Sequence, residues 1–284
     1  MTVAVIEGRL ELDAWRQESQ RQGWTVGFVP TMGGLHEGHL TLVDRARHRY
    51  DKVVVSIFVN PTQFAPGEDY LAYPRELEKD RHLLDQSGCD LLFCPEVSLI
   101  YPHGHTTCVE VGPLGSDLCG ASRPGHFRGV ATVVAILLNL VRPHGLFLGL
   151  KDYQQYILLS QMVRDLAMPV VVEGVATVRE ENGLALSSRN RYLTSAQREQ
   201  ATALYQAMLT AQKLLRLGEQ QPVLLEQSAR EVLHQAGIHH IDYVAVRQAG
   251  TLERIVQIEA DPIILIAVRV GKARLIDNML LTRQ

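Results

Sequence analysis

The stretch TVGFVPTMGGLHEGHL, residues 25–40, decides the fold. Thr25–Val29 has the composition of a buried strand, and apolar side chains recur at helical spacing from Leu40 to Tyr50. A turn rich in glycine joins the two patterns. In open parallel sheets, ligands bind at the carboxyl ends of strands, where the next helix offers N–H groups to phosphate. The stretch therefore predicts an α/β fold with an anion site in the turn.

Short apolar runs and helical patterns alternate through the first two-thirds of the chain. This alternation is typical of a parallel sheet, whose strands are apolar throughout because both faces are covered. We predict a Rossmann-like parallel sheet with helices on both faces, in a domain spanning residues 1–177. The further predicted strands are 52–59, 90–94, 106–111, 146–149 and 170–172, and the further predicted helices are 130–141 and 152–163.

The pattern changes after Val178. Two amphipathic helices are followed by three strand-like runs, which predicts a smaller C-terminal α+β domain over residues 178–284, acting as a lid. The boundary falls between about residues 172 and 190. The helices are predicted at 204–215 and 225–236, and the strands at 241–246, 263–270 and 275–280.

Composition and charge exclude several classes of protein. A net charge of −3 over 284 residues offers no basic surface of the kind that duplex-binding proteins use. No apolar run reaches the length of a membrane helix, and the N-terminus lacks a basic start before an apolar core. The four cysteines form no CxxC pair, which favours reduced core thiols. We expect a cytoplasmic protein with no nucleic-acid or membrane partner.

The histidines His36 and His39 give the turn its chemistry. If both lie on the first helical turn, they share a face and can donate hydrogen bonds to phosphate oxygens. The alternative is a pair of surface histidines, and the HEGH spacing differs from the HExxH zinc pattern. No GxGxxG follows the first strand and no GxxxxGK[ST] is present, which disfavours dinucleotide redox enzymes and P-loop phosphotransferases.

The segment His36-Glu-Gly-His39 resembles the HIGH motif of the nucleotidylyltransferase superfamily. The longer string PTMGGLHEGHLTLV, residues 30–43, resembles the pantoate–β-alanine ligase (pantothenate synthetase) family. Five further blocks match that family in order along nearly the whole chain. They are FVNPTQF at 58–64, Asp69 with YPR at 73–75, RPGHFRG at 123–129, GLKDYQQ at 149–155 and GLALSSRN at 183–190.

The resemblance implies a ligase that works in two steps. The pantoate carboxylate attacks the α-phosphorus of Mg·ATP, giving pantoyl adenylate and pyrophosphate. The amine of β-alanine then displaces AMP and gives pantothenate. The expected partners are therefore the small molecules ATP, pantoate and β-alanine, with Mg²⁺ accompanying ATP, and the expected assembly is a homodimer.

The resemblance also implies an ATP site. Its expected catalytic residues are His39, His36, Lys151 and Arg189, which can stabilise charge on the phosphates. Asp152 can accept hydrogen bonds from ribose or help to order magnesium, whose ligands are otherwise unassigned. The loop at 186–189 is similar to the superfamily's KMSKS-type loop and is expected to close over the β- and γ-phosphates. The expected ATP-binding residues are Met32, Gly33, Gly34, Leu35, His36, Glu37, Gly38, His39, Gly149, Leu150, Lys151, Asp152, Val178, Leu186, Ser187, Ser188 and Arg189.

The glutamines Gln63 and Gln155 match the family positions that bind pantoate. Gln63 follows the predicted strand 52–59, and Gln155 lies on the first turn of the helix after Gly149. Neutral amides suit a hydroxy acid, because they offer donors and an acceptor without forming a salt pair. The Arg123–Gly129 block is expected to shape the site or an interface, with no catalytic role.

Three positions depart from the family pattern. Leu150, Asn182 and Leu186 stand where glutamate, aspartate and methionine are common in the family, and we expect backbone or packing roles there. Two other functions stay open at this stage: a nucleotidylyltransferase, which keeps the nucleotide on its product, and a non-catalytic nucleotide-binding module. The two glutamines and the SSRN block disfavour the first. The joint presence of ATP, phosphate and small-acid blocks disfavours the second.

Overall fold

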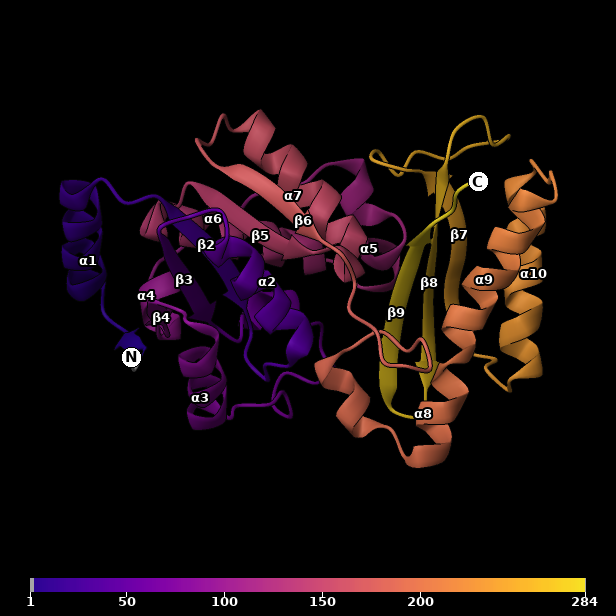
Figure 1. Ribbon diagram of the computed structural model, residues 1–284, viewed down its shortest axis with the longest axis horizontal. Coiled ribbons are helices and arrows are strands. Elements are labelled where there is room, and N and C mark those ends of the chain that lie inside the picture. Colours follow the sequence, from indigo (N-terminus) through magenta and orange to yellow (C-terminus); the bar gives the residue numbers. More distant parts are fainter. Residues whose placement is uncertain (1–2, 284) are drawn as a thin grey trace. The chain divides into compact units, whose positions relative to one another are not determined.

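The computed structural model describes residues 3–283. The chain forms two compact units (Figure 1). The first unit contains the residues up to Leu150 and Leu158–Ala176, and the second contains Lys151–Ile157 and the residues from Thr177 onward. The outermost ends of the two predicted domain ranges, residues 1–2 and 284, lie outside the described residues. The assignment of ATP and pantoate binding to one domain and of a lid to the other stays a prediction.

The first unit is built on a six-stranded sheet whose order is β1-β4-β3-β2-β5-β6. Every neighbouring pair of strands is parallel. The strands are β1 (Ala4–Ile6), β2 (Val26–Thr31), β3 (Lys52–Ile57), β4 (Leu91–Phe93), β5 (Gly145–Gly149) and β6 (Val171–Val175). The predicted parallel α/β sheet is confirmed.

Helices cover the sheet because its strands are apolar on both sides. Val29, Val55 and Phe147 pack in one cluster with α2 (Glu37–Arg47) and α3 (Leu77–Ser87). Strand alternation sends Phe28 and Leu146, both fully buried, to the opposite face. The largely apolar α6 (His126–Val141) contacts the sheet and is buried along most of its length, as a helix with so few polar side chains requires. The other helices of this unit are α1 (Arg9–Gln22), α4 (Val97–Ile100) and α5 (Cys119–Ser122), with part of α7 (Tyr153–Asp165).

The order of the strands places a topological switch point beside β2. The chain runs from β2 to β3 and β4 on one side, and then returns to β5 on the other side of β2. In open α/β sheets, ligands bind outside the carboxyl ends of the strands at such a point. Three segments predicted for the site follow these ends directly: the Met32–His39 loop after β2, Gln63 after β3, and Gly149–Leu150 at the end of β5.

The second unit contains an antiparallel sheet with the order β7-β8-β9. Its strands, β7 (Ile241–Gln248), β8 (Pro262–Val270) and β9 (Ala273–Leu280), pack on α9 (Ala203–Arg216) and α10 (Pro222–Gln235) (Figure 1). A short helix, α8 (Ser195–Ala201), precedes them and is capped by the Thr194 hydroxyl, which accepts from the N–H of Gln197. The predicted smaller α+β region is confirmed as a fold.

Several elements differ from the sequence prediction. The strand predicted at 106–111 is wrong: this segment is an exposed loop without sheet partners, because its alternating β-branched residues have no neighbouring strand. Sequence reasoning missed β1, α1, α3 and α8, which are short or dominated by charged residues. The cysteines are free, as expected, but Cys108 is exposed and does not belong to the core.

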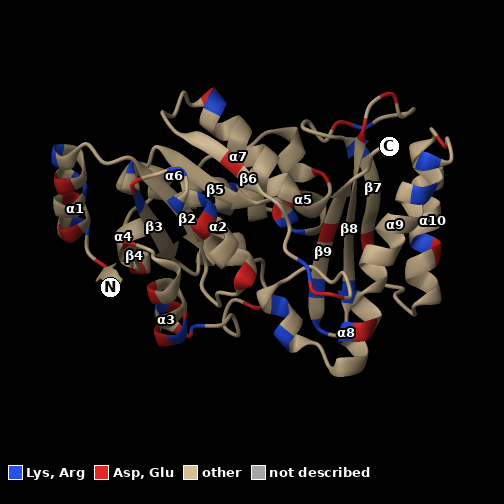
Figure 2. Ribbon diagram, in the orientation of Figure 1, with Lys and Arg blue, Asp and Glu red and all other residues tan. Residues whose placement is uncertain are grey.

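Charges of both signs are interspersed along the helices (Figure 2). On α1, for example, Asp13 pairs with both Arg9 and Arg16 at 2.7 and 2.9 Å. Such mixed surfaces generate no large field of one sign. An anionic ligand must therefore be held by local groups.

Candidate active site

A buried carboxylate holds the Met32–His39 loop, which follows β2, in place. Asp80, on the first turn of α3, is 1% exposed and accepts from the N–H groups of Gly34 and Leu35, both at 2.8 Å. Gly33 has φ +84°, and a Cβ there would lie 3.1 Å from the Asp80 carboxylate, so this close approach requires glycine. These two N–H groups are thus committed to Asp80, which fixes the backbone of the loop.

His36 and His39 stand together at the start of α2. His36 is the N-cap residue of α2, with extended backbone, and His39 lies on the first helical turn. The pair still converges, because the ring centroids are 4.1 Å apart. The backbone N–H of His36 donates to Nδ1 of His39 at 3.3 Å. Since Nδ1 accepts, the proton of His39 sits on Nε2, which can donate to a ligand.

Gln63 ends the short 3₁₀ helix η1 (Pro61–Gln63) and is 9% exposed. Its Oε1 accepts from Asn60 Nδ2 at 3.0 Å, and its Nε2 lies 3.0 Å from the thioether sulfur of Met32. A thioether is a weak acceptor, so a ligand oxygen can replace it. The structure thus brings together Met32 and Gln63, two residues that the sequence placed in different substrate sites.

Asn60 sets the direction of the Gln63 amide. Its Oδ1 accepts from the Tyr101 hydroxyl at 2.8 Å and from the Thr62 hydroxyl at 2.9 Å, which leaves its Nδ2 as the donor to Gln63. Gln63 must therefore turn its oxygen towards Asn60 and its N–H groups away from it. Sequence reasoning missed Asn60, although an Asn followed by Pro is a signal for the start of a helix.

The end of β5 and the segment after it carry five more predicted residues. Gly149 is the last residue of β5, Leu150–Asp152 form the 3₁₀ helix η3, and Gln155 lies on the first turn of α7. The carbonyl of Lys151 accepts from Asn278 Nδ2 at 2.8 Å within the second unit. Lys151 and Gln155 are half-buried, and Asp152 is exposed. These side chains are thus open to a ligand.

The loop from Val178 to Arg189 folds back on itself in the second unit. The carbonyl of Val178 accepts from the N–H of Leu186 at 3.0 Å. The Ser187 hydroxyl caps η4 (Ser188–Tyr192) by accepting from the N–H of Arg189 at 3.3 Å. Ser187, Ser188 and Arg189 are all partly exposed. The structure therefore places this hydroxyl and guanidinium set on one short turn.

An ion pair anchors this loop to β9. Arg179 donates to both carboxylate oxygens of Asp277 at 2.6 and 2.9 Å, and to the carbonyl of Gly183 at 3.0 Å. Asp277 is 3% exposed, and the Arg179 guanidinium lies 4.7 Å from the ring centre of Tyr205. Bidentate pairs of this kind are among the stronger polar contacts. Sequence reasoning missed both partners, which are 98 residues apart.

Comparison with known proteins decides the family. The model of the family described as pantoate-beta-alanine ligase matches residues 4–280. The chain belongs to this family. Its similarity to a pantothenate synthetase from Magnetococcus marinus is 54% identity over 98% of this chain and 96% of that one. The pantothenate synthetase of Thermotoga neapolitana is 50% identical, over 98% of this chain and 99% of its own.

Solved structures agree with the family assignment. The pantothenate synthetase of Thermus thermophilus matches with a TM-score of 0.92 and 47% identity, over 98% of this chain and 99% of that one. The pantoate-beta-alanine ligase of Francisella tularensis, complexed with beta-gamma ATP and beta-alanine, matches with a TM-score of 0.80 and 35% identity, over 98% and 97%. As a member of the pantoate–β-alanine ligase family, the chain is an enzyme that forms pantothenate by joining pantoate to β-alanine. Within residues 3–283, no helix combines the length and apolarity needed to cross a membrane.

Proposed function

We propose that the enzyme activates pantoate as an adenylate at the switch point of the parallel sheet. In the first step, a carboxylate oxygen of pantoate bonds to the α-phosphorus of ATP, and the bond to the bridging oxygen breaks as pyrophosphate leaves. In the second step, the neutral amine of β-alanine bonds to the acyl carbon. The acyl–oxygen bond then breaks, AMP leaves, and the amine releases its proton to solvent.

The convergence of His36 and His39 carries the proposal. Two rings 4.1 Å apart at a helix start can both donate to phosphate oxygens, where the positive end of the helix dipole adds to their effect. Because Nδ1 of His39 is an acceptor, its Nε2–H is aimed away from the backbone and is the proposed donor. Pyrophosphate is a good leaving group and needs charge stabilisation more than a proton.

The remaining predicted residues receive complementary roles. Lys151 is proposed to neutralise phosphate charge, and Ser187, Ser188 and Arg189 to bind the β- and γ-phosphates and leave with pyrophosphate. Gly33, Gly149 and Val178 would contact the nucleotide through their backbone. The second domain would act as a lid over the first, which excludes water from the reactive adenylate.

Gln63 and Gln155 are proposed to bind pantoate. The N–H groups of Gln63 point away from Asn60, so they meet an acceptor oxygen of the hydroxy acid. A neutral amide holds that oxygen without lowering the nucleophilicity of the carboxylate as strongly as a cation would. The weak thioether partner of Gln63 makes the exchange for substrate favourable.

Mg²⁺ is proposed to enter with ATP. Among residues 3–283, no three His, Cys, Asp or Glu side chains gather into a metal site. Mg²⁺ prefers oxygen ligands and retains several waters, so the ion would be held mainly by phosphate oxygens, and the exposed carboxylate of Asp152 could help to order it or accept from the ribose. When bound, the ion would neutralise charge on the triphosphate.

We also propose that the enzyme works in the cytoplasm as a homodimer. The four free cysteines support a reducing compartment, and the family resemblance supports the dimer. Light scattering at micromolar concentration tests the assembly. A monomer under those conditions would contradict it.

The histidine role has a direct test. His39→Ala should lower adenylate formation, followed as exchange of labelled pyrophosphate into ATP, by about 100-fold or more. Its circular dichroism and melting temperature should match those of the wild type. The exposed His48 at the other end of α2 offers a control, because His48→Ala removes a ring without touching the site. Near-normal exchange in His39→Ala overturns the assigned role.

A further inference from the structure

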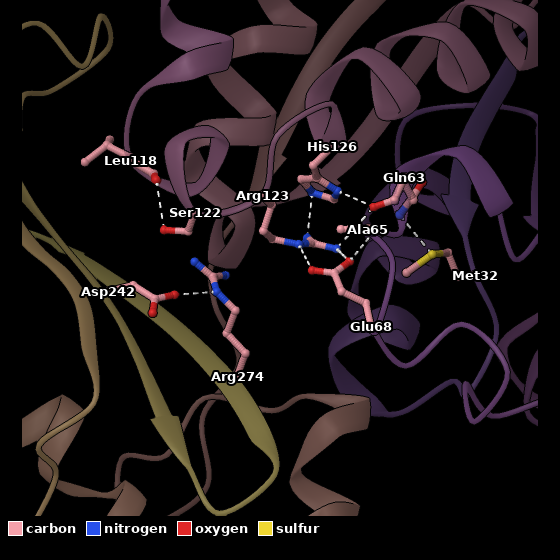
Figure 3. A network of polar contacts seen from close by, with 10 residues as sticks. All are labelled: Met32, Gln63, Ala65, Glu68, Leu118, Ser122, Arg123, His126, Asp242 and Arg274. Carbon is pink, nitrogen blue, oxygen red and sulfur yellow. Dashed lines mark hydrogen bonds and ion pairs between the residues drawn. The ribbon is translucent and has the colours of Figure 1, made fainter.

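Two side chains from the block at 123–129 converge on the main-chain carbonyl of Gln63 (Figure 3). His126 Nδ1 lies 2.8 Å from this oxygen, and Arg123 Nη2 donates to it at 3.2 Å. Arg123 Nη1 lies 2.9 Å from His126 Nε2. We call Glu68, Arg123 and His126 the carbonyl network. Arg123 and His126 contact the Gln63 oxygen, and Glu68 accepts hydrogen bonds from Arg123.

The donors and acceptors of the network fix its protonation. The guanidinium of Arg123 can only donate, so Nε2 of His126 must accept. His126 is therefore neutral with its proton on Nδ1, and this proton is the one that bonds to the Gln63 carbonyl. His126 is 8% exposed, so its orientation is set by these contacts and not by water. Both lone pairs of the carbonyl are thus engaged by directed donors.

Glu68 holds Arg123 in this position. Its two carboxylate oxygens each accept from Arg123, from Nε and from Nη2, both at 2.6 Å. The side chain of Arg123 is only 11% exposed and that of Glu68 only 23%. This burial strengthens the bidentate pair relative to one in water. Burial raises the pKa of Glu68, but the contacts with the Arg123 guanidinium and the Ala65 N–H act against burial, and the pKa lies below its ordinary value. Glu68 also accepts from the N–H of Ala65 at 3.0 Å, two residues beyond Gln63.

Gln63 is thereby fixed from both of its ends. The network pins its main-chain oxygen, and Asn60 pins its side-chain oxygen. The amide N–H groups are then left with one direction, towards Met32. Gly129, on the first turn of α6, allows this close packing, since a Cβ there would lie 2.5 Å from the Thr62 carbonyl oxygen. A small rotation of η1 would redirect the amide.

We propose that Glu68, Arg123 and His126 are positioning residues that orient Gln63 for pantoate. The inference rests on the proposed function of Gln63 and deepens it. Glu68 contacts neither the Gln63 side chain nor the Met32–His39 loop in the hydrogen bonds described, so it acts on pantoate only through Arg123 and the backbone of η1. This gives the block at 123–129, which had no assigned catalytic role, a part in binding pantoate.

The test compares Glu68→Gln, Gln63→Ala and the double variant in steady-state assays with pantoate, ATP and β-alanine. Glu68→Gln keeps the shape of the side chain and removes its charge. We expect kcat/KM for pantoate to fall about 10- to 100-fold, with the KM for ATP within about twofold of the wild type, because misplacing a binding group by about 1 Å has effects of this size. In the Gln63→Ala background, Glu68→Gln should cause no further fall.

Three outcomes are decisive. An unchanged kcat/KM for pantoate in Glu68→Gln, or a full effect of that change on top of Gln63→Ala, overturns the inference. An unchanged KM for pantoate in Gln63→Ala overturns the proposed function of Gln63 itself, which is a separate failure. If Glu68→Gln fails to fold, Arg123→Lys replaces it, since one ammonium cannot reach the carboxylate and the carbonyl as the fork does. Arg49→Ala, which removes a 2.7 Å ion pair with Glu173 in the same unit, is the matched control.

Discussion

Replacing Asp80 by alanine should both loosen the Met32–His39 loop and destabilise the first unit. The carboxylate accepts two backbone N–H bonds of 2.8 Å from buried residues, Gly34 and Leu35. Hydrogen bonds to a charged group contribute about 1.5–3 kcal/mol each, so losing both costs about 3–6 kcal/mol. At about 2–4 °C per kcal/mol, the melting temperature should fall by at least about 6 °C. Asp80→Asn keeps one acceptor and should show about half the effect.

The assay combines thermal melting with pyrophosphate exchange. Because the loop carries His36 and His39, kcat/KM for ATP should fall about 100-fold in Asp80→Ala. Asp44→Ala is the control: Asp44 lies on α2 with its side chain 66% exposed, and its loss should change stability by no more than about 0.5 kcal/mol. An Asp80→Ala protein that melts and exchanges like the Asp44→Ala protein would show that Asp80 does not hold the loop.

Three further predictions follow from single contacts. Gly129→Ala should raise the KM for pantoate, because its Cβ would lie 2.5 Å from a carbonyl oxygen of η1; a wild-type KM would contradict the packing. One thiol, Cys108, should react quickly with Ellman's reagent, because burial raises the pKa of Cys89 and of Cys94 to about 12; fast labelling that survives Cys108→Ser would contradict this. Burial raises the pKa of Glu68, but the hydrogen bonds and charge around it, Arg123 foremost, leave this pKa lowered in the folded state. The stability difference between wild type and Glu68→Gln should therefore be full at pH 7 and shrink as pH falls below 4.5; a constant difference in urea titrations would contradict this.

The sequence predicted the elements with strong periodicity. The buried strand at 52–59 and the apolar helix at 130–141 have patterns that tertiary contacts reinforce, and both are present with shifted ends. The exposed loop at 106–111 has the composition of a strand, and only the absence of a neighbouring strand decides against it. Hydrophobic periodicity also could not predict the order of the strands, because a pairing such as that of β1 with β4 joins residues far apart in sequence.

The residues of the candidate site likewise fall into those that the sequence predicted and those that it did not. Motif residues such as His36, His39 and Gln63 were predictable because their spacing carries the family resemblance. The groups that hold them were not: Asp80 lies 45 and 46 residues from the amides it accepts, and Glu68 lies 55 residues from Arg123. The role of a buried charge depends on its partner, and no local sequence pattern predicts a partner so far away in the chain.

Pantoate itself is the acid that we propose ATP activates at this site. The most direct measurement is exchange of labelled pyrophosphate into ATP in the absence of β-alanine. We predict that label enters ATP only when pantoate is present, and that the complete reaction releases AMP. Exchange that is indifferent to pantoate, or release of ADP in place of AMP, would show that pantoate is not activated as an adenylate.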